Sequence, residues 1–372
     1  MSGKTVFKIK DSVDLFLSNG RYLMVYYMNS RQRKSFRVNN EMIHLLENID
    51  GINHYDELID IMKEKWDVSP EQTAQIIDLL QQNRIITEVI ESQSILSAEL
   101  MERYSRQINY FSEFLGSERD GIAAQKRLID SHVAIFGCGA IGGDIALQLV
   151  MAGVGHITLF DYDKTAISDI ARHMFYREEY LGLYKVEALR RELMRINPEL
   201  TIATITECMQ PQTDITSLIN GADFIVNTLD EPYIGYTASK ISRTCMKYRK
   251  PHYIAGGFDA HLASTGELII PYITPCVECY ASHFKQALKD WKPKKHPVIK
   301  RYDEIGGLSS MSLFSSSYAC IEIIKYLVGL VPIESSYKVR GEFLFHDMSL
   351  TYLNVKKNPN CPICGGNAFN ET

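Results

Sequence analysis

The sequence predicts an α/β protein with a doubly wound, mainly parallel sheet, preceded by a small N-terminal domain of strands and helices. From residue 131 onward, short apolar strands alternate with helical segments, which is typical of a parallel sheet covered on both faces. A Gly-x-Gly-x-x-Gly turn at 137–142 joins the first of these strands to a helix. Before residue 90, by contrast, β-like runs come first and helical segments follow them. We therefore expect two domains, residues 1–90 and 91–372.

The composition excludes several classes of protein. The chain has 372 residues, 45% of them hydrophobic, and a net charge of −5, so it lacks the basic surplus expected of a nucleic-acid binder. The N-terminus has no export signal, and no apolar run is long enough to span a membrane. Eight cysteines without a signal favour reduced thiols and metal ligation over disulfides. We expect a cytoplasmic protein.

The first ninety residues contain two kinds of pattern. Short β-like runs occur between residues 5 and about 37, with Asn19-Gly20 as the clearest hairpin signal. Three helices are then expected over 41–49, 54–66 and 69–87, the last with Ser69 as N-cap and Gln72 as its capping-box partner. This order has the outline of a winged helix-turn-helix module. DNA binding is disfavoured because the third helix has no row of Lys and Arg.

A polar, helical connector of about residues 90–125 leads into the larger domain. The expected strands there are HVAIFG, HITLFD, TIATITE and FIVNTL, and the intervening helices are DIALQLVMAG, KVEALRRELMRI and a segment near 213–219. A basic loop at 289–301 either closes over a site or is an ordinary solvated loop.

The glycine turn is a candidate phosphate-binding site. Glycines allow the chain to turn tightly and let a phosphate approach the N-terminus of the following helix. The candidate residues are Gly137, Gly139, Ala140 and Gly142. Taken alone, this motif is equally typical of a nicotinamide-dependent dehydrogenase and of an enzyme that uses a nucleoside triphosphate, and it also occurs as a packing turn without ligand.

Charged side chains follow the second strand and favour the triphosphate. Asp161 ends that strand, where a carboxylate can accept a hydrogen bond from a ribose hydroxyl. Arg172 and Lys185 supply the positive charge that phosphate transfer needs and hydride transfer does not. The same stretch holds the further candidate nucleotide-binding residues Asp163, Ser168 and Asp169. Individually, Arg172 and Lys185 are also typical of a solvated surface.

A third strand brings another carboxylate to the same edge of the sheet. Asp230 follows the strand FIVNTL, and the carboxyl ends of parallel strands face the ligand crevice. A carboxylate there can hold Mg²⁺ between phosphates. The alternative is a turn or helix-capping aspartate.

Four cysteines give the strongest local signal. Cys276 and Cys279 form one Cys-x-x-Cys pair, and Cys361 and Cys364 form a second about eighty residues later. Two such pairs are typical of tetrahedral, structural Zn²⁺, whereas one pair alone would also suit a redox dithiol. Four protein ligands leave no open position, so the metal would stabilise the fold and take no part in catalysis. The other four cysteines are interpreted as core thiols.

Together these motifs resemble the E1-like superfamily of ThiF, MoeB and ubiquitin-activating enzymes, over about residues 100–372. The resemblance rests on RYSRQI at 103–108, GCGAIGG at 137–143, DYD at 161–163, SDIAR at 168–172, Lys185, INP at 196–198, Asp230 and both cysteine pairs. It implies an ATP-dependent adenylyltransferase that forms a homodimer.

The resemblance also implies roles for individual residues. Arg106 would reach the nucleotide of the partner subunit. Asp161 would bind ribose, Arg172 and Lys185 the phosphates, and Asp230 the Mg²⁺. The family pattern usually has Gly, Asn and Gln where this chain has Ala140, Asp169 and His173. Asp169 adds negative charge beside the triphosphate, so Arg172 or a metal must offset it.

Residues 5–90 resemble the PqqD-like element that recognises leader peptides, which places the chain near the peptide-maturase branch of pantocin A and microcin C7 biosynthesis. Such a domain binds an extended leader as an added strand. ATP would then activate a carboxyl or amide group of a precursor peptide, leading to cyclisation or to nucleotide attachment. Two alternatives stay open: adenylation of the C-terminus of a ubiquitin-like sulfur carrier, and a non-catalytic subunit that docks the leader for a cyclodehydratase.

Overall fold

The computed structural model describes residues 3–89, 95–259, 262–290, 307–330 and 340–365. They form two compact units, Met1–Lys126 and Arg127–Thr372, and the boundary falls within one helix. The sequence-predicted basic loop at 289–301 lies almost wholly outside the described residues. Among the described residues, every helix is too short or too polar to cross a membrane.

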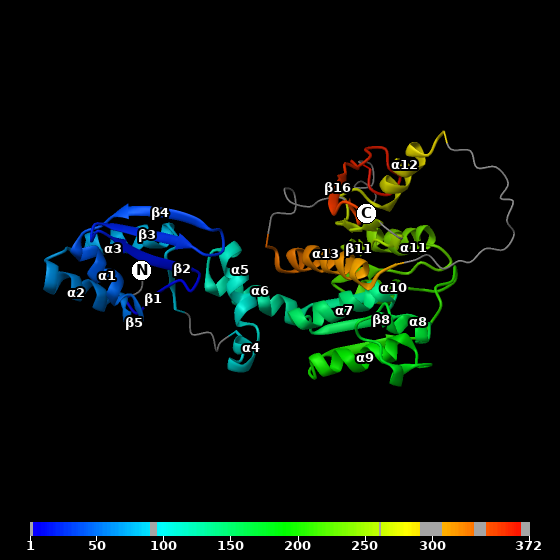
Figure 1. Cartoon of the computed structure of the whole chain (residues 1–372), viewed down its shortest axis with the longest axis horizontal. Helices are drawn as coiled ribbons and strands as arrows, with labels where there is room; N and C mark the ends of the chain where they lie inside the picture. Colours follow the sequence, from blue (N-terminus) through cyan, green and yellow to red (C-terminus); the bar gives the residue numbers. More distant parts are fainter. Residues whose placement is uncertain (1–2, 90–94, 260–261, 291–306, 331–339, 366–372) are drawn as a thin grey trace. The chain divides into compact units, whose positions relative to one another are not determined.

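The N-terminal unit contains two three-stranded antiparallel sheets. One has the order β2-β3-β4 and is drawn in blue in Figure 1, and the other has the order β5-β1-β6. The strands are β1 (Val6–Ile9), β2 (Val13–Ser18), β3 (Tyr22–Tyr27), β4 (Gln32–Arg37), β5 (Asp50–His54) and β6 (Ile86–Glu88). The Asn19-Gly20 turn, with positive φ at both residues, joins β2 to β3 as the sequence predicts.

Five helices lie in the described part of this unit, and a sixth, α6, crosses into the larger one. They are α1 (Asn40–Asn48), α2 (Tyr55–Trp66), α3 (Pro70–Gln82), α4 (Ala98–Arg103), α5 (Ser105–Leu115) and α6 (Glu118–Asp130). Ser69 caps α3, and Gln72 completes the capping box. The predicted end of this helix at residue 87 is wrong, because α3 ends at Gln82 and Ile86–Glu88 pair with β1 as strand β6. Buried apolar side chains of the first three helices form one core with the strands, centred on Leu45, Leu58 and Ile77.

Strand β5 was not predicted from the sequence. Its residues, DGINH, lack the β-branched run that marks a strand. The Asp50 carboxylate accepts hydrogen bonds from the backbone N–H groups of Ile52 and Asn53. Antiparallel pairing with β1 holds the segment extended. Local side-chain chemistry and a tertiary partner therefore replace intrinsic propensity here.

The larger unit is built on a six-stranded sheet of order β14-β11-β10-β7-β8-β9. Its first five members in sequence are parallel, and β14 is antiparallel to β11, which confirms the predicted doubly wound, mainly parallel sheet. The strands are β7 (His132–Phe136), β8 (His156–Phe160), β9 (Thr201–Ile205), β10 (Phe224–Asn227), β11 (His252–Ile254) and β14 (Glu267–Ile269).

Helices cover both faces of this sheet. The long helix α13 (Ser309–Val328) lies along α7 (Ala140–Ala152), which also packs on α9 (Lys185–Ile196); Figure 1 draws α13 in orange beside α7. Helices α10 (Thr216–Gly221) and α11 (Ile234–Lys247) form the core of the other face. Successive side chains of β10 point to opposite faces of the sheet. Phe224 contacts Tyr326 of α13 on one face, and Ile225 joins the α10–α11 core on the other.

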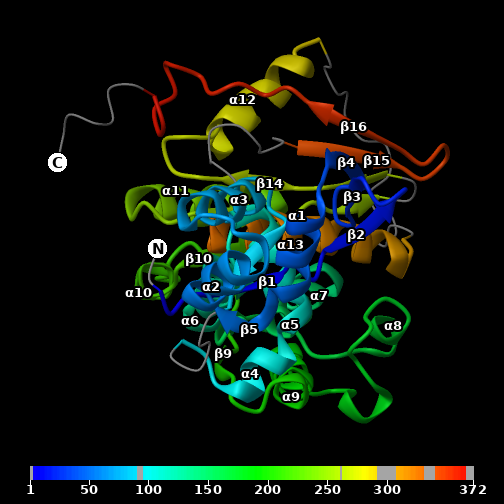
Figure 2. The same cartoon turned by 90° about the vertical axis from the view of Figure 1, so that its left-hand side faces the viewer.

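A second, four-stranded sheet was missed by the sequence prediction. Its order is β12-β13-β15-β16, and Figure 2 draws β15 and β16 in red as a hairpin. The strands are β12 (Phe258–Asp259), β13 (Leu262–Ser264), β15 (Arg340–Leu344) and β16 (Ser349–Leu353). Helix α12 (Val277–Ala287) carries the first cysteine pair at its start.

One charged residue is buried in the contact between α7 and α13. The Asp144 side chain is 2% exposed, and its Oδ2 atom has no hydrogen-bond partner. Burial raises the pKa of this carboxyl to about 7 from an ordinary value of 3.8. Because the folded-state pKa lies above the unfolded one, ionised Asp144 reduces stability as pH rises through the interval between them.

We predict that Asp144→Asn becomes more stabilising, relative to wild type, as pH rises. The difference in free energy of unfolding should grow by about 2 kcal/mol between pH 5 and pH 8, since the amide cannot ionise. Urea unfolding of both proteins at the two pH values measures this difference. An identical difference at pH 5 and pH 8 would contradict the assignment.

Candidate functional site

The glycine turn after β7 is held by close backbone packing. Gly137 has φ +98°, and its N–H donates to the carbonyl oxygen of Phe160 at the end of β8 (2.8 Å). A Cβ on Gly142 would lie 2.0 Å from the carbonyl oxygen of Gly137, whereas a Cβ on Gly139 would meet nothing within 4 Å. The backbone geometry of the turn therefore requires glycine at 137 and 142. At Gly139, the N-cap of α7, the turn is not covered by other atoms.

Asp161 ties this turn to the loop after β8. Its two carboxylate oxygens accept hydrogen bonds from the N–H groups of Cys138 (2.6 Å) and Asp163 (2.8 Å). Burial raises the pKa of Asp161, and the two N–H donors oppose that rise by favouring the ionised form. Each oxygen retains a lone pair, so the carboxylate can still accept a further hydrogen bond from a ligand hydroxyl.

Lys185 begins α9 and points at the same loop. Its Nζ lies 3.0 Å from Oδ2 of Asp163, and its side chain is 13% exposed. Burial alone would lower the pKa of Lys185, but the hydrogen bond to Asp163 and the nearby carboxylates of Asp169 and Asp161 raise it overall. The ammonium is therefore held in its charged form.

Helix α8 (Ile167–Ile170) carries two of the other predicted residues, Ser168 and Asp169, and Arg172 follows just after its end. Ser168 is exposed, whereas Asp169 is buried and accepts a hydrogen bond from the N–H of Ala166 (2.9 Å). The Arg172 guanidinium lies 3.4 Å from Oδ1 of Asp169, and the Arg172 side chain is about half exposed. Thus the carboxylate at 169, unusual for the resembled family, is offset in this structure by the neighbouring arginine.

His173 is buried between Asp169 and two aromatic rings. Its Nδ1–H donates to the carbonyl oxygen of Asp169 (2.7 Å), and its ring lies 4.8 Å from that of Tyr176. Burial lowers the pKa of His173 to about 4, so the ring is neutral at neutral pH. Its Nε2 atom is buried without a partner.

The loop after β10 approaches the glycine turn from the other side. The Thr228 hydroxyl donates to the carbonyl oxygen of Gly137 (3.1 Å), and the N–H of Leu229 donates to the Asn227 side chain (3.1 Å). Asp230 follows on this loop with an exposed side chain. The next residue, Glu231, accepts a hydrogen bond from the Tyr162 hydroxyl and so joins the loops after β8 and β10.

The larger unit thus brings most of the predicted residues to the carboxyl edge of one sheet. The exception is Arg106, which lies exposed in the first turn of α5 in the other unit. The prediction missed Tyr176, whose hydroxyl donates to the carbonyl oxygens of Cys138 (2.7 Å) and Lys185 (3.3 Å), and it missed Thr228. No sequence signal marks either residue, because each contacts backbone that is distant in the chain.

A small pocket opens beside Glu231. It has a volume of about 330 Å³ and lies where the chain leaves β9 and β10. Its lining is mainly apolar and comprises Cys208, Met209, Gln210, Pro211, Glu231, Pro232 and Tyr236. Such a pocket, beside the ends of parallel strands, suits a flat apolar ring with polar edges.

A larger hollow of about 700 Å³ lies at the opposite edge of the sheet. It is lined by residues just before β7, β10 and β11, among them Ser131, Asp223 and Pro251. Ligands of open α/β sheets bind at the carboxyl ends of the strands. The glycine turn, at the carboxyl ends of the strands, is therefore the candidate functional site despite the greater size of this hollow.

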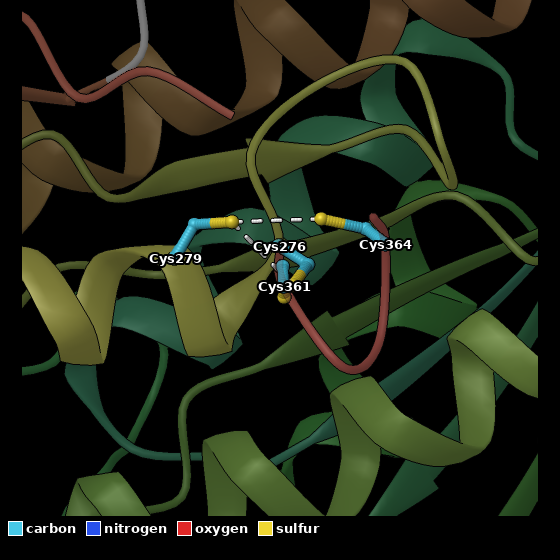
Figure 3. A group of neighbouring side chains, drawn as sticks. All are labelled: Cys276, Cys279, Cys361 and Cys364. Atoms are coloured by element: carbon cyan, nitrogen blue, oxygen red, sulfur yellow. Dashed lines mark hydrogen bonds between the residues drawn. The ribbon is translucent and has the colours of Figure 1, made fainter. Parts of the chain in front are cut away.

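The two cysteine pairs meet in space. Figure 3 shows Cys276 and Cys279 from the start of α12 with their sulfurs directed at Cys361 and Cys364. All four Sγ atoms lie within 4.8 Å of one another, and two cross-pair distances are 3.5 Å. Tetrahedral zinc with Zn–S bonds of about 2.3 Å requires S···S distances of about 3.8 Å. The donor set therefore fits one Zn²⁺ ion.

The comparisons with known proteins agree on the larger unit. The sequence pattern of the ThiF family matches residues 104–363. The molybdopterin-synthase adenylyltransferase of Escherichia coli K12 is 27% identical over 276 residues, which is 73% of this chain and 98% of that protein. This relative leaves about a quarter of the chain unmatched.

Two solved structures extend the similarity to almost the whole chain. Escherichia coli MccB, crystallised with ATP, has a TM-score of 0.67 and 19% identity and covers 97% of this chain and 99% of its own. PaaA has a TM-score of 0.71 and 21% identity, over 94% of this chain and all of its own. Another structure is of the microcin C7 biosynthetic enzyme MccB in complex with N-formylated MccA. At these identities the likeness establishes the fold.

We predict that Gly142→Ala disrupts the turn. The added Cβ would collide with backbone, so the free energy of unfolding should fall by about 2 kcal/mol and binding of Mg²⁺·ATP should weaken at least tenfold. Calorimetry measures both quantities. Gly221→Ala is the matched control because a Cβ there meets nothing within 4 Å. Unchanged nucleotide affinity in Gly142→Ala would contradict this account of the turn.

Proposed function

We propose that this chain, which belongs to the ThiF family, adenylates a carboxyl or amide group of a ribosomally made precursor peptide that carries a leader. Membership of the family makes it an ATP-dependent adenylyltransferase. The observation that carries the proposal is the convergence of the glycine turn, Asp161, Lys185 and Arg172 at one edge of the sheet. That grouping combines the open N-terminus of α7 at Gly139 with fixed positive charge.

The site offers a partner for each part of ATP. The open N-cap at Gly139 would receive a phosphate on the N-terminus of α7. Asp161, which retains lone pairs, would accept the ribose hydroxyls. The apolar pocket beside Glu231 would hold the adenine ring.

Charge on the triphosphate would be neutralised from several directions. Lys185 and Arg172 each rest on a carboxylate in this structure, and the nucleotide would compete for them. Arg106 would act on the nucleotide bound by a second copy of the chain in a homodimer. Asp230 offers an exposed carboxylate, the oxygen ligand that Mg²⁺ prefers, and bound Mg²⁺ would offset charge on the departing pyrophosphate.

The reaction is a nucleotidyl transfer. An oxygen of the peptide carboxyl or amide attacks the α-phosphorus of ATP, forming an O–P bond as the bond between the α-phosphorus and the bridging oxygen breaks. Pyrophosphate leaves with that electron pair. Lys185 and Arg172 stabilise the charge that develops on the phosphoryl oxygens. The product is an acyl adenylate from a carboxyl group, or an O-adenylated imidate from an amide that has lost its N–H proton. An internal nucleophile can then close a ring and release AMP, or the nucleotide can be retained on the peptide.

The N-terminal domain supports a peptide substrate. Residues 1–90, the proposed PqqD-like leader-recognition domain, combine two three-stranded sheets with helices α1 to α3. The similarity to MccB and PaaA covers almost the whole chain, whereas the ThiF family pattern begins only at residue 104. We place the enzyme in the biosynthesis of peptide natural products such as antibiotics. The leader would add to the small sheet as an extended strand.

The second candidate function is adenylation of the C-terminus of a ubiquitin-like sulfur carrier. The sequence relative named as a molybdopterin-synthase adenylyltransferase favours it, since almost all of that protein is matched. The two functions differ in the substrate that triggers pyrophosphate release. A short precursor peptide with a leader does so in the first, and a folded carrier protein ending in Gly-Gly does so in the second.

We predict that Asp230→Asn lowers the rate of pyrophosphate release at least a hundredfold. Loss of the metal-binding charge removes stabilisation of the departing pyrophosphate. A coupled pyrophosphate assay with Mg²⁺·ATP and the precursor peptide measures the rate. Glu199→Gln, an exposed acid in the turn before β9, is the control and should retain wild-type turnover. Undiminished turnover in Asp230→Asn would remove this residue from the mechanism.

We further predict about one zinc ion per chain. Cys364→Ser should lose the metal and lower the Tm by roughly 10 °C, because four-thiolate sites join distant segments of the chain. Elemental analysis and thermal unfolding measure the two effects. Cys208→Ser, outside the cluster, should change neither. Purified protein with no zinc and an unaltered Tm in Cys364→Ser would refute a structural metal site.

A further inference from the structure

The sheet β2-β3-β4 has a free edge at β4. Strand β4 (Gln32–Arg37) pairs with β3 in antiparallel register, and no other strand in the described part of the chain pairs with its outer side. Every residue of β4 except Phe36 has an exposed side chain. Such an edge presents unpaired backbone N–H and C=O groups to any extended peptide.

Charge on this edge is all of one sign. Residues 21–37 contain five cations, Arg21, Arg31, Arg33, Lys34 and Arg37, and no Asp or Glu, in a chain whose net charge is −5. None of the five pairs with a carboxylate among the described residues. A basic edge of this kind discourages pairing with a second copy, because like charges would meet.

The two faces of β4 differ. The register sets Arg33 opposite Tyr26 and Arg37 opposite Tyr22, which places both arginines on one face, with the Arg33 guanidinium 5.7 Å from the centre of the Tyr26 ring. On the other face, Phe36 packs on the hydrophobic core and Lys34 donates to Asn83 beyond α3. An added strand would therefore meet two arginines on one side and an apolar residue on the other.

We propose that the leader of the precursor carries an acidic, extended segment that adds to β4 as a fourth strand. This inference rests on the proposed function and names the chemistry of its partner. Because Arg33 and Arg37 are four positions apart on one face, the segment carries Asp or Glu at positions i and i+4. An apolar residue next to one of these acids lies against Phe36. Backbone pairing supplies affinity, and the charges select the register and partner.

The test uses the full-length protein and a fluorescein-labelled twelve-residue peptide with Glu at every fourth position and Val, Leu and Thr between. We expect it to bind more tightly than the same peptide with Gln for Glu, and the difference to shrink as salt is added. Fluorescence anisotropy measures both affinities. The double variant Arg33→Glu/Arg37→Glu should bind the acidic peptide at least tenfold more weakly and should bind a Lys-substituted peptide instead.

Two controls separate charge from folding. Arg33→Lys/Arg37→Lys keeps the charge and should keep most of the affinity. Lys63→Glu changes an exposed cation on α2, away from β4, and should change nothing. Equal affinity for the Glu and Gln peptides, no binding by the wild-type protein, or tighter binding of a twelve-nucleotide oligothymidine would each overturn the proposal; the last would assign the edge to nucleic acid.

Failure of this inference is distinguishable from failure of the proposed function. Pyrophosphate release with the precursor peptide but without preference for acidic leaders would retain the function and reject the acidic segment. Charge-dependent binding of the acidic peptide without any pyrophosphate release would retain the basic edge as a peptide site and reject adenylation.

Discussion

The carboxylate of Asp161 is the interaction on which the site depends. With one oxygen it accepts the N–H of Cys138 in the glycine turn, and with the other it accepts the N–H of Asp163, whose side chain pairs with Lys185. Three segments that are distant in sequence are thereby set in one arrangement before any ligand binds. Catalysis by fixed charges requires such preorganisation, because donors that must reorient during reaction lose much of their advantage.

Charge balance is the second constraint. The site holds its cations on carboxylates, Lys185 on Asp163 and Arg172 on Asp169, so the two buried charges, Lys185 and Asp169, each have a partner within the protein. A triphosphate would exchange one set of anionic partners for another, which costs less than charging an apolar cleft. The acid at position 169, where the resembled family usually has Asn, is thus compatible with phosphate binding as long as Arg172 accompanies it.

Sequence reasoning predicted what depends on local or periodic features. The capping box at Ser69 and Gln72, the parallel sheet and the glycine turn all have short-range signals, and the cysteine pairs imply their own proximity through metal chemistry. It missed contacts made through backbone across long separations. Tyr176 and Thr228 bind carbonyl oxygens of the turn, and nothing in their neighbourhoods predicts this. Strand β5 likewise depends on its partner β1 more than on its own residues.

The central claim is that ATP is cleaved between its α- and β-phosphates to activate a peptide. Phosphorus NMR of the products formed by the purified chain with Mg²⁺·ATP and the precursor peptide tests it most directly. The account predicts pyrophosphate, together with AMP or a nucleotidyl-peptide, in proportion to the modified peptide. Formation of ADP and inorganic phosphate would show transfer of the γ-phosphoryl group and would contradict adenylation.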